Sequence, residues 1–241
     1  MHEVHISEER KMLASMAHDI KAPLSSIIDL LDVIGKGYVE DLDKIKELVD
    51  RAVQKAETLV LMLDDILDYT LLEDKAMMKR EIVNIFEVVN ESFSMMKTYT
   101  RERNISLNLR KDLSDEKNIN GNYTFLLRVF NNLIMNAIKY NKADGEITID
   151  YSENTKENTI TIAVADTGIG IPEDEQEKIF KIFERGRNAR RNINGSLGLG
   201  LSLVKQIIED HDGEIKLTST VGVGTIIYVT LPLIIVKEEQ K

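Results

Sequence analysis

The sequence predicts a two-helix hairpin that dimerises into a four-helix bundle, followed by an α/β sandwich domain with a mixed sheet. Two apolar stripes at helical spacing in the first 73 residues predict the hairpin. Strand-like and helix-like segments alternate through the rest of the chain, which is typical of a sheet with helices packed on it. Two glycine clusters in this second part mark a candidate ligand site.

The first two predicted helices are amphipathic, because their apolar side chains recur every three or four residues. The stripe of the first helix consists of Met12, Met16, Ile20, Pro23, Ile27, Leu31 and Ile34. The stripe of the second consists of Ile45, Leu48, Ala52, Ala56, Leu59, Leu63, Ile66 and Thr70. Gly35 and Gly37 mark the turn between the helices. Two helices alone cannot shield such a seam from water, so a homodimer is expected.

The heptad pattern lapses around residues 71–81, and the linker is placed at 74–82. It separates a helical hairpin domain, 1–73, from a second domain, 83–241. Helices are predicted over 84–104, 122–141 and 202–211, and strands over 105–110, 146–153, 159–166, 213–220 and 224–233. Strands in pairs with helices between them predict a mixed sheet with helices on one face.

Composition excludes several classes of function. A net charge of −10 disfavours nucleic-acid binding, which needs a cationic surface. The absence of cysteine excludes disulfides, thiolate zinc sites and cysteine nucleophiles, and it fits a cytoplasmic location. His2 and His5 have no further ligand beside them and do not predict a metal site. No apolar run reaches the roughly 18 residues of a membrane span, although the chain is compatible with attachment to an upstream sensor or membrane region.

Each glycine cluster of the second domain predicts a place where backbone approaches a ligand. In "VADTGIGIPE", Asp166, Gly168 and Gly170 follow a strand, and the carboxylate can accept a hydrogen bond from an exocyclic amine. In "GSLGLGLSLVK", Gly195, Gly198 and Gly200 open a helix, whose N–H groups can bind phosphate oxygens. Taken alone, each cluster is more often a tight turn.

The segment "NNLIMNAIKYN" predicts polar groups on one helix face. Asn132 and Asn136 lie four residues apart, so their side chains emerge on the same side. Amide oxygens are ligands that Mg²⁺ accepts beside phosphate and water. Lys139 and Tyr140 follow one turn later, offering a cation for a phosphate and a ring for a base. An asparagine pair on a helix is by itself more often a cap or surface polarity.

The segment "KIFERGRNARR" is strongly basic, whereas the chain as a whole is acidic. It carries one acid, Glu184, and five basic residues: Lys181, Arg185, Arg187, Arg190 and Arg191. A solvated loop is the default interpretation, and polyphosphate binding by guanidinium groups is the sharper one. Phe180 and Phe183 are expected to anchor this loop by burial.

Together and in this order, these segments resemble the kinase core of a two-component sensor histidine kinase with a GHKL-type ATP-binding domain. "NLIMNAIKY" resembles the N box, "DTGIG" the first glycine box, "IFKIFERG" the F box and "GLGLSLVK" the second glycine box. "HDGEI" and "GVGTIIYVTLP" are similar to the closing strands of the family. "MAHDIKAPL" resembles its phosphoacceptor motif, and the resemblance extends from Ser7 to Pro232.

The resemblance implies a kinase that transfers the γ-phosphoryl group of ATP to an imidazole nitrogen of His18. Asp19 would orient the ring and take its proton, and Arg185 would neutralise the transferring group. At about 100° per residue His18 lies about 200° around the helix from Met16, so its ring is expected to face solvent. The final acceptor implied by the family is an aspartate on the receiver domain of a response regulator.

The resemblance also assigns the nucleotide-binding residues. Asp166 would read the adenine amine, Tyr140 would pack on the ring, and Lys139 would neutralise phosphate. Mg²⁺ would be held by Asn136 with help from Asn132. Backbone at the glycine boxes would contact the nucleotide through Gly168, Gly170, Gly198 and Gly200.

Three positions depart from the family pattern, and one is Asp19, a shorter acid than the more common glutamate. Ala22 stands where a polar residue helps these kinases dephosphorylate the regulator, so weak or absent phosphatase activity is expected. Leu197 replaces a frequent threonine, and nothing is predicted for it. Two alternatives stay open: a GHKL-fold ATPase that hydrolyses ATP to drive a conformational cycle, and a dimeric scaffold that binds nucleotide without phosphorylating histidine. The sequence does not decide whether phosphorylation occurs within one chain or across the dimer.

Overall fold

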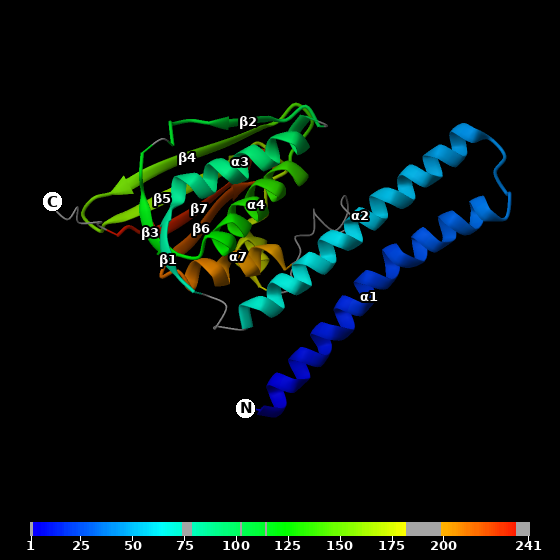
Figure 1. The fold of residues 1–241 in the computed structure, drawn as a ribbon, viewed down its shortest axis with the longest axis horizontal. Helices are drawn as coiled ribbons and strands as arrows, with labels where there is room; N and C mark the ends of the chain where they lie inside the picture. The colour runs from blue at the N-terminus through cyan, green and yellow to red at the C-terminus, as the bar shows by residue number, and fades with distance from the viewer. Residues whose placement is uncertain (1, 74–78, 102, 114, 182–198, 235–241) are drawn as a thin grey trace. The chain divides into compact units, whose positions relative to one another are not determined.

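The computed structural model describes residues 2–73, 79–101, 103–113, 115–181 and 199–234. The chain forms two compact units, the first made of two long helices up to Thr70 and the second beginning at Leu71 (Figure 1). Within the described residues, the search for a helix long and apolar enough to cross a bilayer found none.

The first unit is the predicted helical hairpin. Helix α1 spans His2–Gly35 and helix α2 spans Leu42–Glu73, and the two run antiparallel (Figure 1). Gly37 adopts a left-handed φ of 69° in the turn between them, a conformation that costs glycine little. Asp41 starts α2 as a side-chain cap, because its Oδ1 accepts hydrogen bonds from the backbone N–H groups of Asp43 and Lys44 at 2.9 and 3.2 Å.

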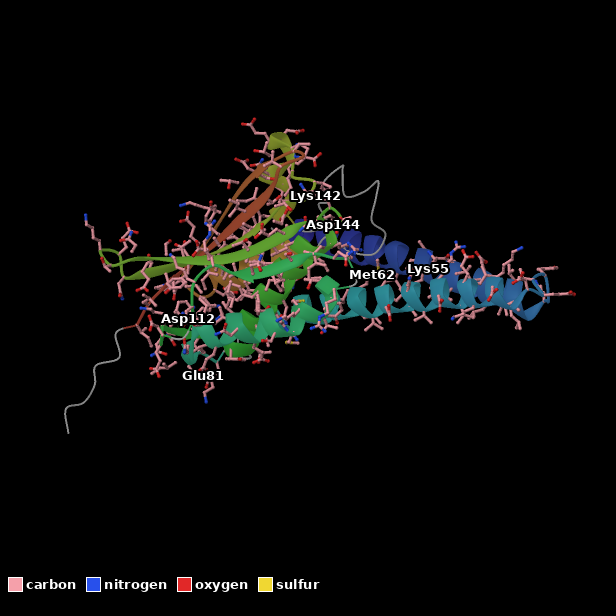
Figure 2. The ribbon with its side chains drawn as sticks, turned by 90° about the horizontal axis from the view of Figure 1, so that it is seen from above. Lys55, Met62, Glu81, Asp112, Lys142 and Asp144 are labelled. Carbon is pink, nitrogen blue, oxygen red and sulfur yellow. The ribbon has the colours of Figure 1, made fainter. Side chains whose placement is uncertain are left out.

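The predicted stripes are right in period, and one hairpin covers most of their described positions. Leu31, Ala56 and Leu63 lie on the predicted stripes and are exposed in a single hairpin. Leu30 is half-buried beside the first of them. Met62, which Figure 2 labels on α2, is buried beside the last. A stripe that advances by alternating steps of three and four is compatible with either of two neighbouring residues, so packing decides between them.

A second apolar stripe remains exposed on this unit. Its side chains have exposed fractions from 40% to 57%, and their spacing is again three, four or seven residues. They are Leu24, Ile28 and Leu31 on α1 and Val49, Val53, Val60 and Leu63 on α2. A single hairpin therefore leaves apolar side chains that recur at heptad spacing exposed to water.

The second unit is built on the predicted mixed sheet of five strands. Their spatial order is β2, β4, β5, β7, β6, with β2 parallel to β4 and every other pair antiparallel. The strands are β2 (Ser106–Leu109), β4 (Glu146–Asn154), β5 (Thr159–Asp166), β6 (Glu214–Thr220) and β7 (Gly224–Pro232). The register places Asp166, the last residue of β5, opposite Thr225 of β7.

Three helices cover one face of this sheet, as predicted (Figure 1). They are α3 (Ile85–Arg101), α4 (Tyr123–Lys139) and α7 (Gly200–Glu209). Alternate strand residues such as Ile149, Ile162 and Val229 point into the core that these helices share. The core therefore fixes α4 and α7, which carry candidate site residues, against the sheet.

Four short elements were not predicted. Strands β1 (Glu81–Asn84) and β3 (Asn118–Gly121) pair antiparallel in a separate sheet, and β1 takes in residues 81 and 82, the last two of the predicted linker. Helix α5 (Glu173–Gln176) and the 3₁₀ helix η2 (Lys178–Phe180) follow β5. Elements of three or four residues are too short to show a period, so their sequences resemble turns.

Candidate functional site

Helix α4 holds the asparagine pair. Its start is fixed by Asn122, whose Oδ1 accepts a hydrogen bond from the backbone N–H of Phe125 at 3.2 Å. Asn132 and Asn136 are both half-buried. Asn132 lies against the first turn of α7, because a Cβ built on Gly200 would stand 2.8 Å from its Oδ1. The structure therefore brings Asn132 of α4 and Gly200 of α7 together.

The other end of α4 carries the predicted cation and ring. The Nζ of Lys139 lies 5.6 Å from the ring centroid of Tyr140. Arg103, which the sequence did not single out, donates from Nη1 to the carbonyls of Ile138 and Lys139 at 3.3 and 3.1 Å. A cation there adds a donor to the last carbonyls of the helix and suits the negative end of its dipole.

The loop after β5 packs closely against this helix end. The backbone N–H of Ile169 donates to the carbonyl of Tyr140 at 3.1 Å. A Cβ on Gly168 would stand 2.3 Å from that same carbonyl oxygen, so only glycine fits. Gly170 has a φ of 66°, and its Cβ would stand 2.1 Å from the carbonyl oxygen of Thr220. Both glycines are thus required by backbone packing around the candidate site.

Asp166 is held at the base of this loop. Its Oδ1 accepts a hydrogen bond from the backbone N–H of Gly168 at 2.8 Å. Burial raises the pKa of Asp166 above its usual 3.8, and hydrogen bonds from the backbone of Gly168 and Thr225 partly oppose that rise. A half-buried carboxylate with one side fastened to the backbone can present its remaining lone pairs to a ligand amine.

Thr225 belongs to this site although the sequence reasoning missed it. It is buried, and its Oγ1 shares a hydrogen bond of 2.8 Å with the Oγ of Ser219. The signal that could have found it is the third glycine turn, Gly222 to Gly224, directly before it. Gly224 has a φ of 147°, and a Cβ there would stand only 1.9 Å from the carbonyl oxygen of Asp166. This turn therefore also packs closely against the site.

Several predicted residues are not placed. The backbone of His18 and Asp19 lies within α1, and their side chains are outside the described residues. Residues outside the described part of the chain are Phe183, Arg185, Arg187, Arg190, Arg191, Gly195, Leu197 and Gly198. The expected anchor of the basic segment is corrected in part, because Ile179 is buried there while Phe180 is only half-buried.

The donor set of the described residues fits a nucleotide with a divalent cation. One edge of the second unit presents a carboxylate with a raised pKa, three glycine positions that a Cβ would block, two amide side chains and a cation. Among the described residues, no three His, Asp or Glu side chains form a cluster that could hold a metal. Any cation at this site would depend on the amide oxygens of Asn132 and Asn136, together with phosphate and water.

Two family models match the chain over two successive stretches. The His Kinase A (phospho-acceptor) domain matches residues 8–75, which include His18. The histidine kinase-, DNA gyrase B- and HSP90-like ATPase domain matches residues 121–235, which include Asn132 and Asp166. The two matches follow one another in the order that the sequence motifs predicted.

Whole-chain comparisons agree with these matches. The chain is 27% identical over 237 residues to the sensor protein kinase WalK of Staphylococcus aureus (strain MRSA252), covering 96% of this chain and 38% of the relative. It is 30% identical over 240 residues to drug sensory protein A of Synechocystis sp. (strain ATCC 27184 / PCC 6803 / Kazusa), covering 95% of this chain and 36% of the relative. The chain thus spans little more than a third of the length of these relatives.

Among solved structures, the fold is similar to that of the histidine kinase ThkA in its complex with the response regulator protein TrrA. The TM-score is 0.75 at 24% sequence identity, and the likeness covers 95% of this chain and 63% of that chain. At this identity the likeness concerns the fold, and it extends over both units.

Proposed function

Because this chain belongs to the sensor histidine kinases, we propose that it is an ATP-dependent kinase that phosphorylates its own His18 and passes the phosphoryl group to an aspartate of a response regulator. The observation that carries the proposal is the succession of a phospho-acceptor domain and an ATPase domain in one chain. The domain boundaries are part of the proposal: hairpin 1–73, linker 74–82 and ATP-binding domain 83–241. It also implies a cytoplasmic location, where ATP is available.

The nucleotide would be held by the edge of the second unit described above. Asp166 would accept a hydrogen bond from the adenine amine, and Tyr140 would pack on the ring. Lys139 would neutralise phosphate, and Asn136 with Asn132 would hold Mg²⁺. Bound ATP would supply the phosphoryl group, and Mg²⁺ would balance charge on its phosphates. The support is geometric, since the hydrogen bond from Gly168 already orients the Asp166 carboxylate.

The phosphoacceptor would be the imidazole of His18, which must be neutral to act as a nucleophile. Asp19 would orient the ring and accept its proton as positive charge develops. Arg185, with Lys139, would neutralise the group in transfer, and backbone at Gly168, Gly170, Gly198 and Gly200 would contact the phosphates and base. Such transfers depend mainly on positioning and charge stabilisation.

The test of this function is incubation of the full chain with γ-labelled ATP and Mg²⁺. We expect label on the protein that is lost in acid and kept in base, as a phosphoramidate requires. Free phosphate without labelled protein would support a GHKL-fold ATPase instead. Bound nucleotide with neither product would support the dimeric scaffold.

The exposed second stripe supports a homodimer. Pairing two hairpins into a four-helix bundle would cover these apolar side chains, which single hairpins leave in water. Light scattering coupled to gel filtration should give a mass of twice 27.4 kDa for the full chain. Val53→Glu places a charge on the stripe and should yield monomers, whereas Gln54→Glu, one residue off the stripe, should remain dimeric. A monomeric wild-type chain would contradict this part of the proposal.

The response-regulator partner is proposed from the family, and the ThkA structure holds such a regulator. Ala22 lies one turn after His18 on α1 and is exposed, with no polar atom to orient a water. We expect the chain with ADP to leave the decay of a phosphorylated partner regulator nearly unchanged. Ala22→Thr should accelerate that decay, and Ala22→Val, of similar size without the hydroxyl, should not. Strong acceleration by the wild type would show that Ala22 does not limit this activity.

A further inference from the structure

Helices α4 and α7 are antiparallel neighbours that share the core, and two polar contacts between them lie at separated points. At the first point, Gly200 at the beginning of α7 lies against Asn132 in the middle of α4. At the second, His211 directly after α7 lies against Asn122 at the start of α4, and its Nε2 accepts the backbone N–H of Asn122 at 2.9 Å. Only the first point belongs to the candidate nucleotide site.

At the second point, the ring of His211 is buried and both of its nitrogens are hydrogen-bonded. His211 is 1% exposed, and its Nδ1 lies 2.6 Å from the carbonyl oxygen of Ile207. Because the backbone N–H of Asn122 can only donate, Nε2 is the acceptor and Nδ1 carries the proton. Gly121 makes room for the ring, since a Cβ there would stand 2.9 Å from its Cδ2. The imidazole thus joins the end of α7 to the start of α4.

The surroundings of His211 keep the ring neutral, as this bonding requires. Burial lowers the pKa of His211 below its usual 6.5, although the hydrogen bond to Ile207 and the nearby Asp210 and Asp212 act the other way. Arg80 also lowers it, and that guanidinium is paired with Asp212 at 2.6 Å. The acceptor at Nε2 is therefore present at neutral pH.

The two contact points lie at opposite ends of α7. Asn122, the N-cap of α4, and Asn132 are separated by about 15 Å along α4, and Gly200 and Glu209 by about 14 Å along α7, at 1.5 Å per residue, with His211 two residues beyond that helix end. Hydrogen-bonded helices do not stretch, so a slide of α7 at the His211 end moves its Gly200 end by the same amount. The adenine contacts do not move with α7, because hydrogen bonds from the backbone of Gly168 and Thr225 hold the Asp166 carboxylate in place.

We propose that His211 is a positioning residue: it sets the axial register of α7 against α4, and hence the distance between Asn132 and the backbone N–H groups at the start of α7. This inference rests on the proposed function, which seats the phosphates of ATP between those groups. His211 itself touches no part of the nucleotide. It acts on the phosphates through the helix and leaves the adenine contacts unchanged.

Two substitutions separate the two hydrogen bonds of the ring. His211→Gln places an amide oxygen near the position of Nε2 and can still accept from Asn122. His211→Asn places its amide near the position of Nδ1, so it can still donate to Ile207 but cannot reach Asn122. The pair differs by one methylene and therefore serves as its own matched control.

The measurement is the dissociation constant of the full chain for adenosine and, with Mg²⁺, for a non-hydrolysable ATP analogue. We expect His211→Asn to raise the dissociation constant for the ATP analogue about tenfold and that for adenosine hardly at all. A sub-ångström shift of the groups that bind phosphate has effects of that order or larger. His211→Gln should keep the wild-type ratio of the two constants. Equal losses for both ligands, or the same ratio in both variants, would overturn the proposal.

A second measurement needs no variant, should His211→Asn fail to fold. Hydrogen exchange of the Asn122 amide in the wild-type chain should slow when the ATP analogue binds, and not when adenosine binds. An amide that responds equally to both ligands, or to neither, would overturn the coupling. If the wild type bound neither ligand, the proposed function would fail and this inference with it, whereas normal binding with an unchanged ratio would remove this inference alone.

Discussion

The His18→Gln variant should take up no phosphoryl group from γ-labelled ATP, while the wild-type chain becomes labelled. Glutamine keeps a polar side chain on the helix but offers an amide nitrogen that is not nucleophilic. The label should fall to background, because the chain holds only three other histidines: His2, His5 and the buried His211. The measurement is acid-labile, base-stable label on the protein after gel separation.

The control for this loss is the nucleotide affinity of the same variant. His18 lies in the first unit and the candidate nucleotide residues lie in the second, so the dissociation constant for ATP should stay at the wild-type value. His5→Gln, which changes a histidine on the same helix, should label normally. Persistent label on His18→Gln would place the phosphoacceptor elsewhere and contradict the proposed function.

Asp166→Asn should weaken ATP binding about 100-fold, the second largest effect that the structure predicts. The native carboxylate accepts hydrogen bonds from the backbone of Gly168 and Thr225 and would accept a third from the adenine amine. An amide in its place brings an NH₂ group toward donors and leaves at least one of them unpaired in a partly buried site. Calorimetric titration measures the loss, and Asp150→Asn on the neighbouring strand β4 should bind ATP normally.

The pH dependence of ATP binding should carry the signature of the same carboxyl group. Burial raises the pKa of Asp166, so on acidification it takes up its proton earlier than an exposed aspartate would. ATP affinity should therefore fall as pH drops through that raised pKa. The free energy of unfolding should move the opposite way: this group favours the folded state most below its unfolded pKa, and that contribution is lost as pH rises through the folded pKa. Asp166→Asn should abolish both dependences, and a wild-type affinity independent of pH would contradict this role.

Local hydrophobic pattern was enough to predict the long helices, but it does not decide which of two neighbouring apolar residues is buried. Steps of three and four predicted α1 and α2 and the turn at Gly37, yet they do not say which side chains a single hairpin covers: Leu30 and Met62 are covered in it, whereas Leu31 and Leu63 are exposed. Both residues of each pair fit a helical period within one step. Which of them is buried depends on the opposite helix, and that information is not local.

Strand length explains much of the outcome in the second unit, although the four-residue β2 was also predicted. Strands β4, β5 and β7 are eight or nine residues long, enough for alternation to show, and the pairs β4–β5 and β6–β7 were predicted. Strands β1 and β3 have four residues each, and Glu81 of one pairs with Gly121 of the other across a long loop. No short stretch of sequence contains both strands, so local pattern could not predict this two-stranded sheet.

By itself, the sequence determined the order of the motifs, the residue types they supply and the family to which the chain belongs. Tertiary structure decided which of those residues meet. It put Thr225 against Asp166 and His211 against Asn122, the latter pair 89 positions apart, and it showed that Gly168 must be glycine because Tyr140 leaves no room for a side chain. The reason is physical: hydrophobic period encodes which face of an element is buried, whereas contacts between distant elements follow from sheet register and helix packing.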